Sequence, residues 1–144
     1  MELTQVLWVH FGVTAYMVGV IAVVQAVHYP MFAWVDRDRY IDFQKRHMQG
    51  ITWVVGPPMV VEAMLAVGLV LIDHSGVSGS LAALGLVLLG VVWGSTALQQ
   101  VPAHNRLMQG FDEDAHRSLV RSNWVRTLAW TGRLGVAWAM LGAA

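Results

Sequence analysis

Two apolar runs are long enough to cross a lipid bilayer, and they limit the fold more than any other feature of the sequence. Residues 80–98 (SLAALGLVLLGVVWGSTAL) carry no charged side chain, and residues 3–27 carry none if His10 is neutral. A transmembrane helix needs about 20 predominantly apolar residues. Only 12% of the residues are charged, whereas a soluble domain carries about 25%. The chain is therefore predicted to be an integral membrane protein rather than a soluble domain with a large core.

The predicted fold is all-α, a single-domain bundle of four transmembrane helices at about residues 4–27, 51–72, 80–101 and 123–141. No basic segment or small-residue cleavage site accompanies the first span, so it is predicted to be a retained helix rather than a signal peptide. Short amphipathic helices at the membrane interface are expected after spans one and three, at about residues 40–47 and 115–123. Pro57 and Pro58 should interrupt span two and free backbone carbonyls near Trp53 and Val54.

Lysine and arginine are concentrated in the two long connections, residues 28–50 and 102–122. These basic residues are Arg37, Arg39, Lys45, Arg46, Arg106, Arg117 and Arg121. The termini and the turn at 73–79 contain none, so the positive-inside rule predicts that both connections are cytoplasmic and both termini outside. The predicted location is the bacterial inner membrane. Zero net charge without a basic tract argues against a nucleic-acid partner, and the absence of cysteine excludes disulfides and thiolate metal sites.

Two charged residues lie deep within predicted spans. Glu62 and Arg133 are each about eleven residues from the cytoplasmic end of their span, which places them at similar depth. Because a charge in the bilayer requires a partner, a buried Glu62–Arg133 interaction is predicted. Such a pair can either fix the helix packing or take part in function.

Three histidines, His28, His47 and His104, gather at the cytoplasmic ends of spans one, two and three. Neutral imidazole is a common metal ligand and a suitable general base. With Glu62 and Asp112 nearby, one interpretation is a metal ion held by these histidines. The other is local hydrogen bonding without a cofactor, because no two histidines have the i, i+4 spacing of a shared helix face.

Spans one, three and four carry more polar and aromatic groups than helix packing needs. The candidate ligand-binding residues are Gln25, Tyr29, Trp93, Thr96, Gln100, Asn105, Asn123 and Trp130. They predict a small polar pocket that opens toward the cytoplasm, is floored by Glu62 and Arg133, and is walled by tryptophans. Such a pocket suits an aromatic or quinone-like ligand.

Residues 101–107 (VPAHNRL) and 123–127 (NWVRT), together with Tyr29-Pro30 and residues 43–47 before Pro57, resemble the anthrone-oxygenase-like family of small four-helix membrane proteins. In that family a V-P-x-N-type motif ends the third span and an N-x-x-R motif opens the fourth. Here His104 takes a position usually held by asparagine, and Leu119 lies near a common tryptophan position. The resemblance implies a four-helix fold and, where it extends to chemistry, oxygenation of an activated polycyclic phenol without a metal.

Two classes of function remain open. As an oxidoreductase, the protein would act on a hydrophobic aromatic or quinone-like substrate. His28, His104 or Glu62 would then accept a proton, and Arg126 or Arg133 would stabilise the resulting oxyanion. Alternatively, it is a non-enzymatic module that binds metal, haem or lipid, or an accessory subunit of a membrane complex or homo-oligomer. Transport is least supported, because no span carries repeated charges.

Overall fold

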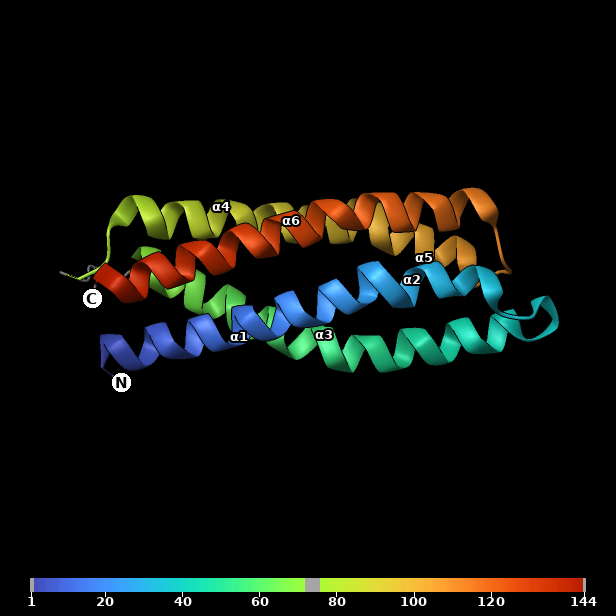
Figure 1. The fold of residues 1–144 in the computed structure, drawn as a ribbon, viewed down its shortest axis with the longest axis horizontal. Coiled ribbons are helices and arrows are strands. Elements are labelled where there is room, and N and C mark those ends of the chain that lie inside the picture. Colours follow the sequence, from blue (N-terminus) through green and yellow to red (C-terminus); the bar gives the residue numbers. More distant parts are fainter. Residues whose placement is uncertain (1, 72–75, 144) are drawn as a thin grey trace.

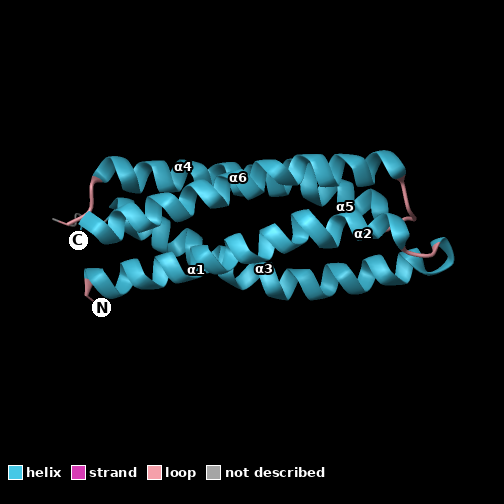
Figure 2. Ribbon diagram, in the orientation of Figure 1, coloured by secondary structure: helices cyan, strands magenta, loops and turns pink. Residues whose placement is uncertain are grey.

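The computed structural model describes residues 2–71 and 76–143, and all regular structure within them is helical (Figure 2). The prediction of an all-α protein is confirmed. The consecutive helical segments make up four long rods. These rods run side by side, with both ends of the chain at one end of the molecule (Figure 1). That end is called the terminal end here, and the opposite end is called the loop end. The predicted end of span two at residue 72 and most of the turn after it lie outside the described residues.

Each rod is built from consecutive helical segments. The first rod contains α1 (Leu3–Val23), the π-helical η1 (Val24–His28), α2 (Tyr29–Met31) and the 3₁₀ turn η2 (Phe32–Trp34). The second contains the 3₁₀ turn η3 (Arg37–Arg39) and α3 (Tyr40–Leu71). The third contains α4 (Gly79–Ser95), the π-helical η4 (Thr96–Gln100) and α5 (Val101–Leu107), and the fourth is α6 (Glu113–Ala143).

The first three rods are long and apolar enough to span a membrane. The fourth, α6, does not meet that standard, because it carries several polar residues along its length. Asn123, Arg126 and Arg133 are all buried against the other rods, while Leu128 and Trp138 are exposed on the outside of the bundle. Within residues 123–141, the charged side chains of α6 are therefore directed inward.

The first and third rods continue past their prolines, contrary to the predicted ends of spans one and three. In each rod a π-helical segment ends two residues before the proline, at His28 before Pro30 and at Gln100 before Pro102. A proline ring clashes with the carbonyl four residues earlier in an α-helix. The wider π turn relieves that clash and lets the helix continue.

The second rod also continues where an interruption was predicted. Pro57 and Pro58 both lie inside α3. Pro58 has no N–H for the Val54 carbonyl, and the Tyr16 hydroxyl of α1 donates to that carbonyl at 3.2 Å instead. The predicted freed carbonyl is thus confirmed at Val54, but the break in the helix is wrong.

The predicted interfacial helices are not separate elements. Residues 40–47 and 115–123 are helical, but they are the first turns of α3 and α6. No proline or glycine stands between each segment and its span except Gly50, which a helix tolerates at a modest cost. The amphipathic segments are therefore continuous with the apolar ones.

Asp112 caps the start of α6. Its carboxylate accepts the Ala115 N–H at 2.7 Å and pairs with Arg106 at 2.7 Å. These contacts, the backbone hydrogen bond first and the arginine second, hold the pKa of the Asp112 carboxyl below its ordinary value. The cap fixes where the loop end of the fourth rod begins.

Candidate functional site

Most buried polar side chains lie in two layers at different depths. Measured along the helices from the terminal end, Glu62 and Arg133 lie at about 15 Å, whereas His47 and His104 lie at about 37 Å. The layers are thus about 20 Å apart. The prediction of one pocket floored by Glu62 and Arg133 is therefore wrong.

The first layer is a hydrogen-bonded network around Glu62, in which Arg133 Nε has no partner among the described residues. Its carboxylate accepts Thr14 Oγ1 at 2.9 Å and Trp130 Nε1 at 2.8 Å, and it pairs with Arg133 Nη2 at 3.4 Å. Arg133 also donates to the Gly85 carbonyl. The predicted Glu62–Arg133 ion pair is confirmed. Because the network joins all four rods and both charged side chains are almost fully buried, its geometry suits holding the bundle together.

The second layer surrounds Phe32 at the loop end. The ring centroids of His28, His47, His104 and His116 lie 5.3, 4.9, 6.3 and 6.4 Å from the centroid of Phe32, which is fully buried. One histidine comes from each rod. The three histidines predicted to gather here are brought together, and the sequence reading missed His116.

Several nitrogens of these histidines bond to neighbouring groups, although His47 Nε2 is buried without a partner among the described residues. His28 Nε2 and His47 Nδ1 are 2.8 Å apart, so one ring donates and the other accepts. His104 bonds to the Gln44 amide through Nδ1 at 2.8 Å and to the Tyr29 hydroxyl through Nε2 at 3.1 Å. Across residues 2–71 and 76–143, no group of three or more histidine and carboxylate side chains has the arrangement to hold a metal ion. The described residues therefore favour local hydrogen bonding over the predicted metal site.

A pocket of about 200 Å³ lies beside this layer, between α3 and the loop end of the third rod. Its polar side is formed by Tyr29, Thr96, Gln100, His104 and Arg126. Its other side is mainly apolar and is lined by Met48, Ile51, Thr52, Val55, Gly56, Met59 and Val101. Five of the predicted site residues therefore meet in one pocket, which we call the α3/α5 pocket.

Arg126 gives the α3/α5 pocket its electrostatic character. The residue is only 5% exposed. Its Nη1 donates to Asn123 Oδ1 at 3.3 Å, and the guanidinium lies 5.1 Å from the ring centroid of Trp130. Within the described part of the chain, Arg126 has no carboxylate partner, and its Nε is unpaired. A buried positive charge without a counter-ion favours an anionic or electron-rich group in the adjoining pocket.

A second unpaired group points to the same chemistry. Gln100 donates through Nε2 to Ser122 Oγ at 2.7 Å, while its buried Oε1 has no partner. The pocket is thus lined by the Arg126 cation, by Gln100 with its unpartnered Oε1, and by the linked Tyr29–His104 pair. These groups can recognise a ligand that carries both a hydroxyl and a negatively polarised oxygen.

The remaining predicted ligand residues lie elsewhere. Asn123 donates to Gln25 Oε1 at 3.0 Å, and Gln25 donates to the Val120 carbonyl at 3.3 Å, so this chain joins α6 to the first rod. Trp93 and Asn105 are exposed, and Trp130 is bonded to Glu62. No tryptophan lines the α3/α5 pocket, so the predicted tryptophan walls are wrong.

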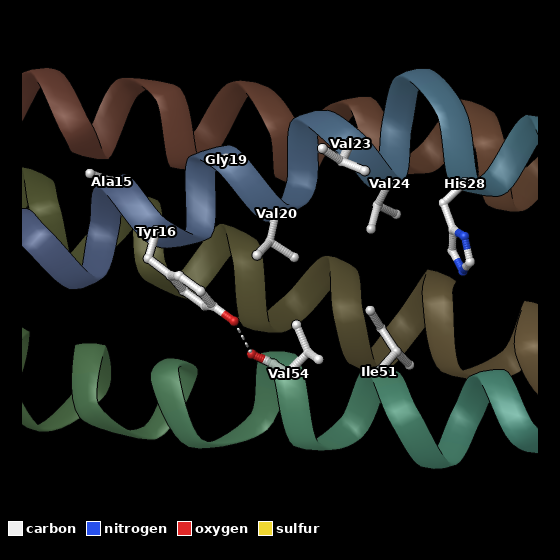
Figure 3. A pocket seen from close by; sticks show the side chains of 9 residues that line it. All are labelled: Ala15, Tyr16, Gly19, Val20, Val23, Val24, His28, Ile51 and Val54. Atoms are coloured by element: carbon white, nitrogen blue, oxygen red, sulfur yellow. Dashed lines mark hydrogen bonds between the residues drawn. The ribbon is translucent and has the colours of Figure 1, made fainter.

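The sequence reading also missed Gln44 and a second groove. Gln44 shares a face with Tyr40 and His47 by i, i+4, i+7 spacing, and this spacing was the signal that could have identified it. The groove has a volume of about 570 Å³ and lies between α1 and α3 (Figure 3). It is lined mainly by valines and small residues, with His28 projecting into one end.

Comparisons with protein-family models, curated proteins and solved structures find no match to this chain. The resemblance to the anthrone-oxygenase-like family therefore stays a prediction from short motifs. Four residues of those motifs line the α3/α5 pocket, namely Tyr29, Val101, His104 and Arg126.

Proposed function

We propose that this is an integral membrane protein that binds a small hydrophobic ligand with a phenolic or quinone-type oxygen in the α3/α5 pocket. In this proposal α6 crosses the bilayer as the fourth span. The inward direction of Arg126 and Arg133 and the exposure of Leu128 (66%) and Trp138 (64%) support that placement, because polar groups in spans face the bundle interior. The arginine-rich loop end would face the cytoplasm of a bacterial inner membrane.

The observation that carries the proposal is the buried, carboxylate-free guanidinium of Arg126 on the wall of a mainly apolar pocket. A charge-assisted hydrogen bond to a phenolate or quinone oxygen would compensate its burial. The exposed Thr52 and Val101 at the rim give the pocket an opening on the side of the bundle, so a ligand can enter from the membrane. Lipid or haem binding without chemistry would use the same opening.

In the enzymatic form of the proposal, the protein is an oxidoreductase. The Tyr29 hydroxyl accepts the phenolic proton and passes its own proton to Nε2 of the neutral His104 imidazole, while Arg126 stabilises the phenolate. Dioxygen would be the oxidant for an activated polycyclic phenol. One oxygen atom would become a ring carbonyl in place of two hydrogens, and the other would leave as water.

Binding can be tested on purified protein in lipid nanodiscs. Quenching of tryptophan fluorescence by a naphthoquinone or by naphthol would give the dissociation constant. Arg126→Gln should weaken binding by about tenfold or more, because a hydrogen bond to a charged group contributes about 1.5–3 kcal/mol. Arg46→Gln, an exposed arginine at the same end, is the matched control and should bind as the wild type does. Equal binding by both variants would refute the proposal.

Chemistry and topology need separate measurements. Oxygen uptake with an anthrone, followed by identification of the product, separates an oxygenase from a binding module.

Because the chain has no cysteine, single introduced cysteines can be labelled specifically to determine the topology. A membrane-impermeant maleimide should label Ser78→Cys but not Asp38→Cys in intact cells. The opposite pattern would reverse the proposed orientation. Labelling of both sites would argue against membrane crossing.

A further inference from the structure

At the loop end of the bundle, α6 begins near α2 (Figure 1). The residues at this place form a basic pocket on the outside of the bundle. Its volume is about 300 Å³, and it is lined by Pro30, Glu113, His116, Arg117, Val120 and Arg121. Apart from Pro30, the lining comes from two turns of α6. This pocket is separate from the α3/α5 pocket and has no part in the function proposed above.

The charges in this pocket are predominantly positive. Glu113 is the acidic residue in the lining, and it pairs with Arg117 at 3.4 Å. Arg121 is exposed and makes no hydrogen bond or ion pair with any described residue. His116 Nε2 bonds to the Tyr29 carbonyl at 2.8 Å, which fixes the orientation of the ring. The lining therefore holds one uncompensated positive charge and a second that is shared with an exposed carboxylate.

The position of the pocket along α6 matches the headgroup region of a bilayer. Arg121 and Arg117 lie about 33 and 39 Å from the terminal end of the helix, whereas the hydrocarbon layer is about 30 Å thick. Trp124 and Leu128 follow on the same face, one and two turns closer to the membrane centre, and are 53% and 66% exposed. The two arginines thus lie at the depth of the headgroups, the tryptophan at the interface and the leucine in the hydrocarbon layer.

We propose that this pocket binds the phosphate group of an anionic phospholipid, with Arg117 and Arg121 as the donors. One acyl chain of the lipid would run along Trp124 and Leu128. The apolar continuation of the face favours a lipid over a free phosphate ion, which would gain nothing from those two side chains. The inference rests on the proposed crossing of the membrane by α6.

Native mass spectrometry of the detergent-purified full chain tests this inference with phosphatidylglycerol and phosphatidylcholine as probes. The wild type should bind phosphatidylglycerol more tightly. Each arginine near an anionic headgroup contributes a factor of about five, so the double variant Arg117→Gln/Arg121→Gln should lose about 25-fold in affinity for phosphatidylglycerol. The control Arg39→Gln/Arg46→Gln removes the same charge from exposed positions outside the pocket and should retain the affinity.

Equal affinity of the wild type for the two lipids would overturn the inference. Equal losses in both double variants would also overturn it, since they would indicate general charge attraction rather than a site. Inorganic phosphate that displaces the lipid at millimolar concentration would assign the pocket to a free anion instead. Extraction of the protein from membranes by alkaline carbonate is measured in parallel, because release would contradict the membrane crossing itself and not only this lipid site.

Discussion

Two ion pairs in this protein differ in burial but share their geometry. Arg133–Glu62 and Arg117–Glu113 each join an arginine Nη2 to a glutamate Oε1 at 3.4 Å. The first pair is 1% and 0% exposed, and the second is 58% and 79% exposed. A double-mutant cycle on each pair, with glutamine as the replacement, therefore compares the coupling free energy of a buried pair with that of an exposed pair at the same distance.

The buried pair should show strong coupling. Removing one partner of a buried pair costs about 3–5 kcal/mol, because the other charge is left uncompensated. Glu62→Gln and Arg133→Gln should thus each cost about 3 kcal/mol. The double variant should cost about 4 kcal/mol instead of 6, which is a coupling of about 2 kcal/mol. The exposed pair should couple by about 0.5 kcal/mol or less.

The assay is reversible unfolding in mixed micelles of a mild detergent and dodecyl sulfate, followed by circular dichroism. The helix signal in circular dichroism reports the unfolding of all four rods, so no further probe is needed. Additive costs at Glu62 and Arg133 would refute the reasoning, since they would show that the two charges do not compensate each other. A coupling in the exposed pair as large as in the buried pair would equally refute the role of burial.

Three further predictions use the same unfolding assay. Tyr16→Phe should destabilise the wild type by about 1 kcal/mol. In a Pro58→Ala background it should cost almost nothing, because a backbone N–H again donates to the Val54 carbonyl. Equal costs in the two backgrounds would contradict the proposed compensation. Because the pKa of Asp112 is lowered in the fold, its stabilising contribution is present at neutral pH and lost as the pH falls through the lowered pKa. Asp112→Asn should remove that acid dependence, and an unchanged pH profile would count against it. Gly85→Leu should destabilise by about 1–3 kcal/mol through overpacking, since a Cβ there lies 3.6–3.7 Å from α6 side chains, whereas Gly90→Leu has open space and should be nearly neutral.

The apolar runs were sufficient to predict the all-α class, because hydrophobic length depends on the sequence alone. The Glu62–Arg133 pair could be predicted because both residues lie the same number of residues into their predicted spans. The depth of the pair could not be predicted, because α3 and α6 begin at Tyr40 and Glu113, about ten residues before the predicted spans. Counting from the later starts placed the pair too close to the loop end.

The α3/α5 pocket was only half predictable. Its polar residues stood out as costly groups within apolar runs. Its apolar wall did not, because Met48, Ile51 and Val55 resemble any lipid-facing residues, and only the separation between rods decides that they line a pocket. Gln44 was not identified either, because its residue type alone does not distinguish this buried glutamine from a solvent-facing one in an amphipathic segment.

The rods contain 29 to 35 residues and are therefore about 43–53 Å long, which exceeds the hydrocarbon thickness of about 30 Å. If the terminal end lies at one surface of the bilayer, the α3/α5 pocket lies where hydrocarbon gives way to water at the other. A ligand of the proposed kind partitions into that boundary before it meets the protein. Occupancy would then follow the mole fraction of ligand in the lipid rather than its total concentration. Adding empty vesicles should therefore release the ligand by surface dilution, with no change in the protein.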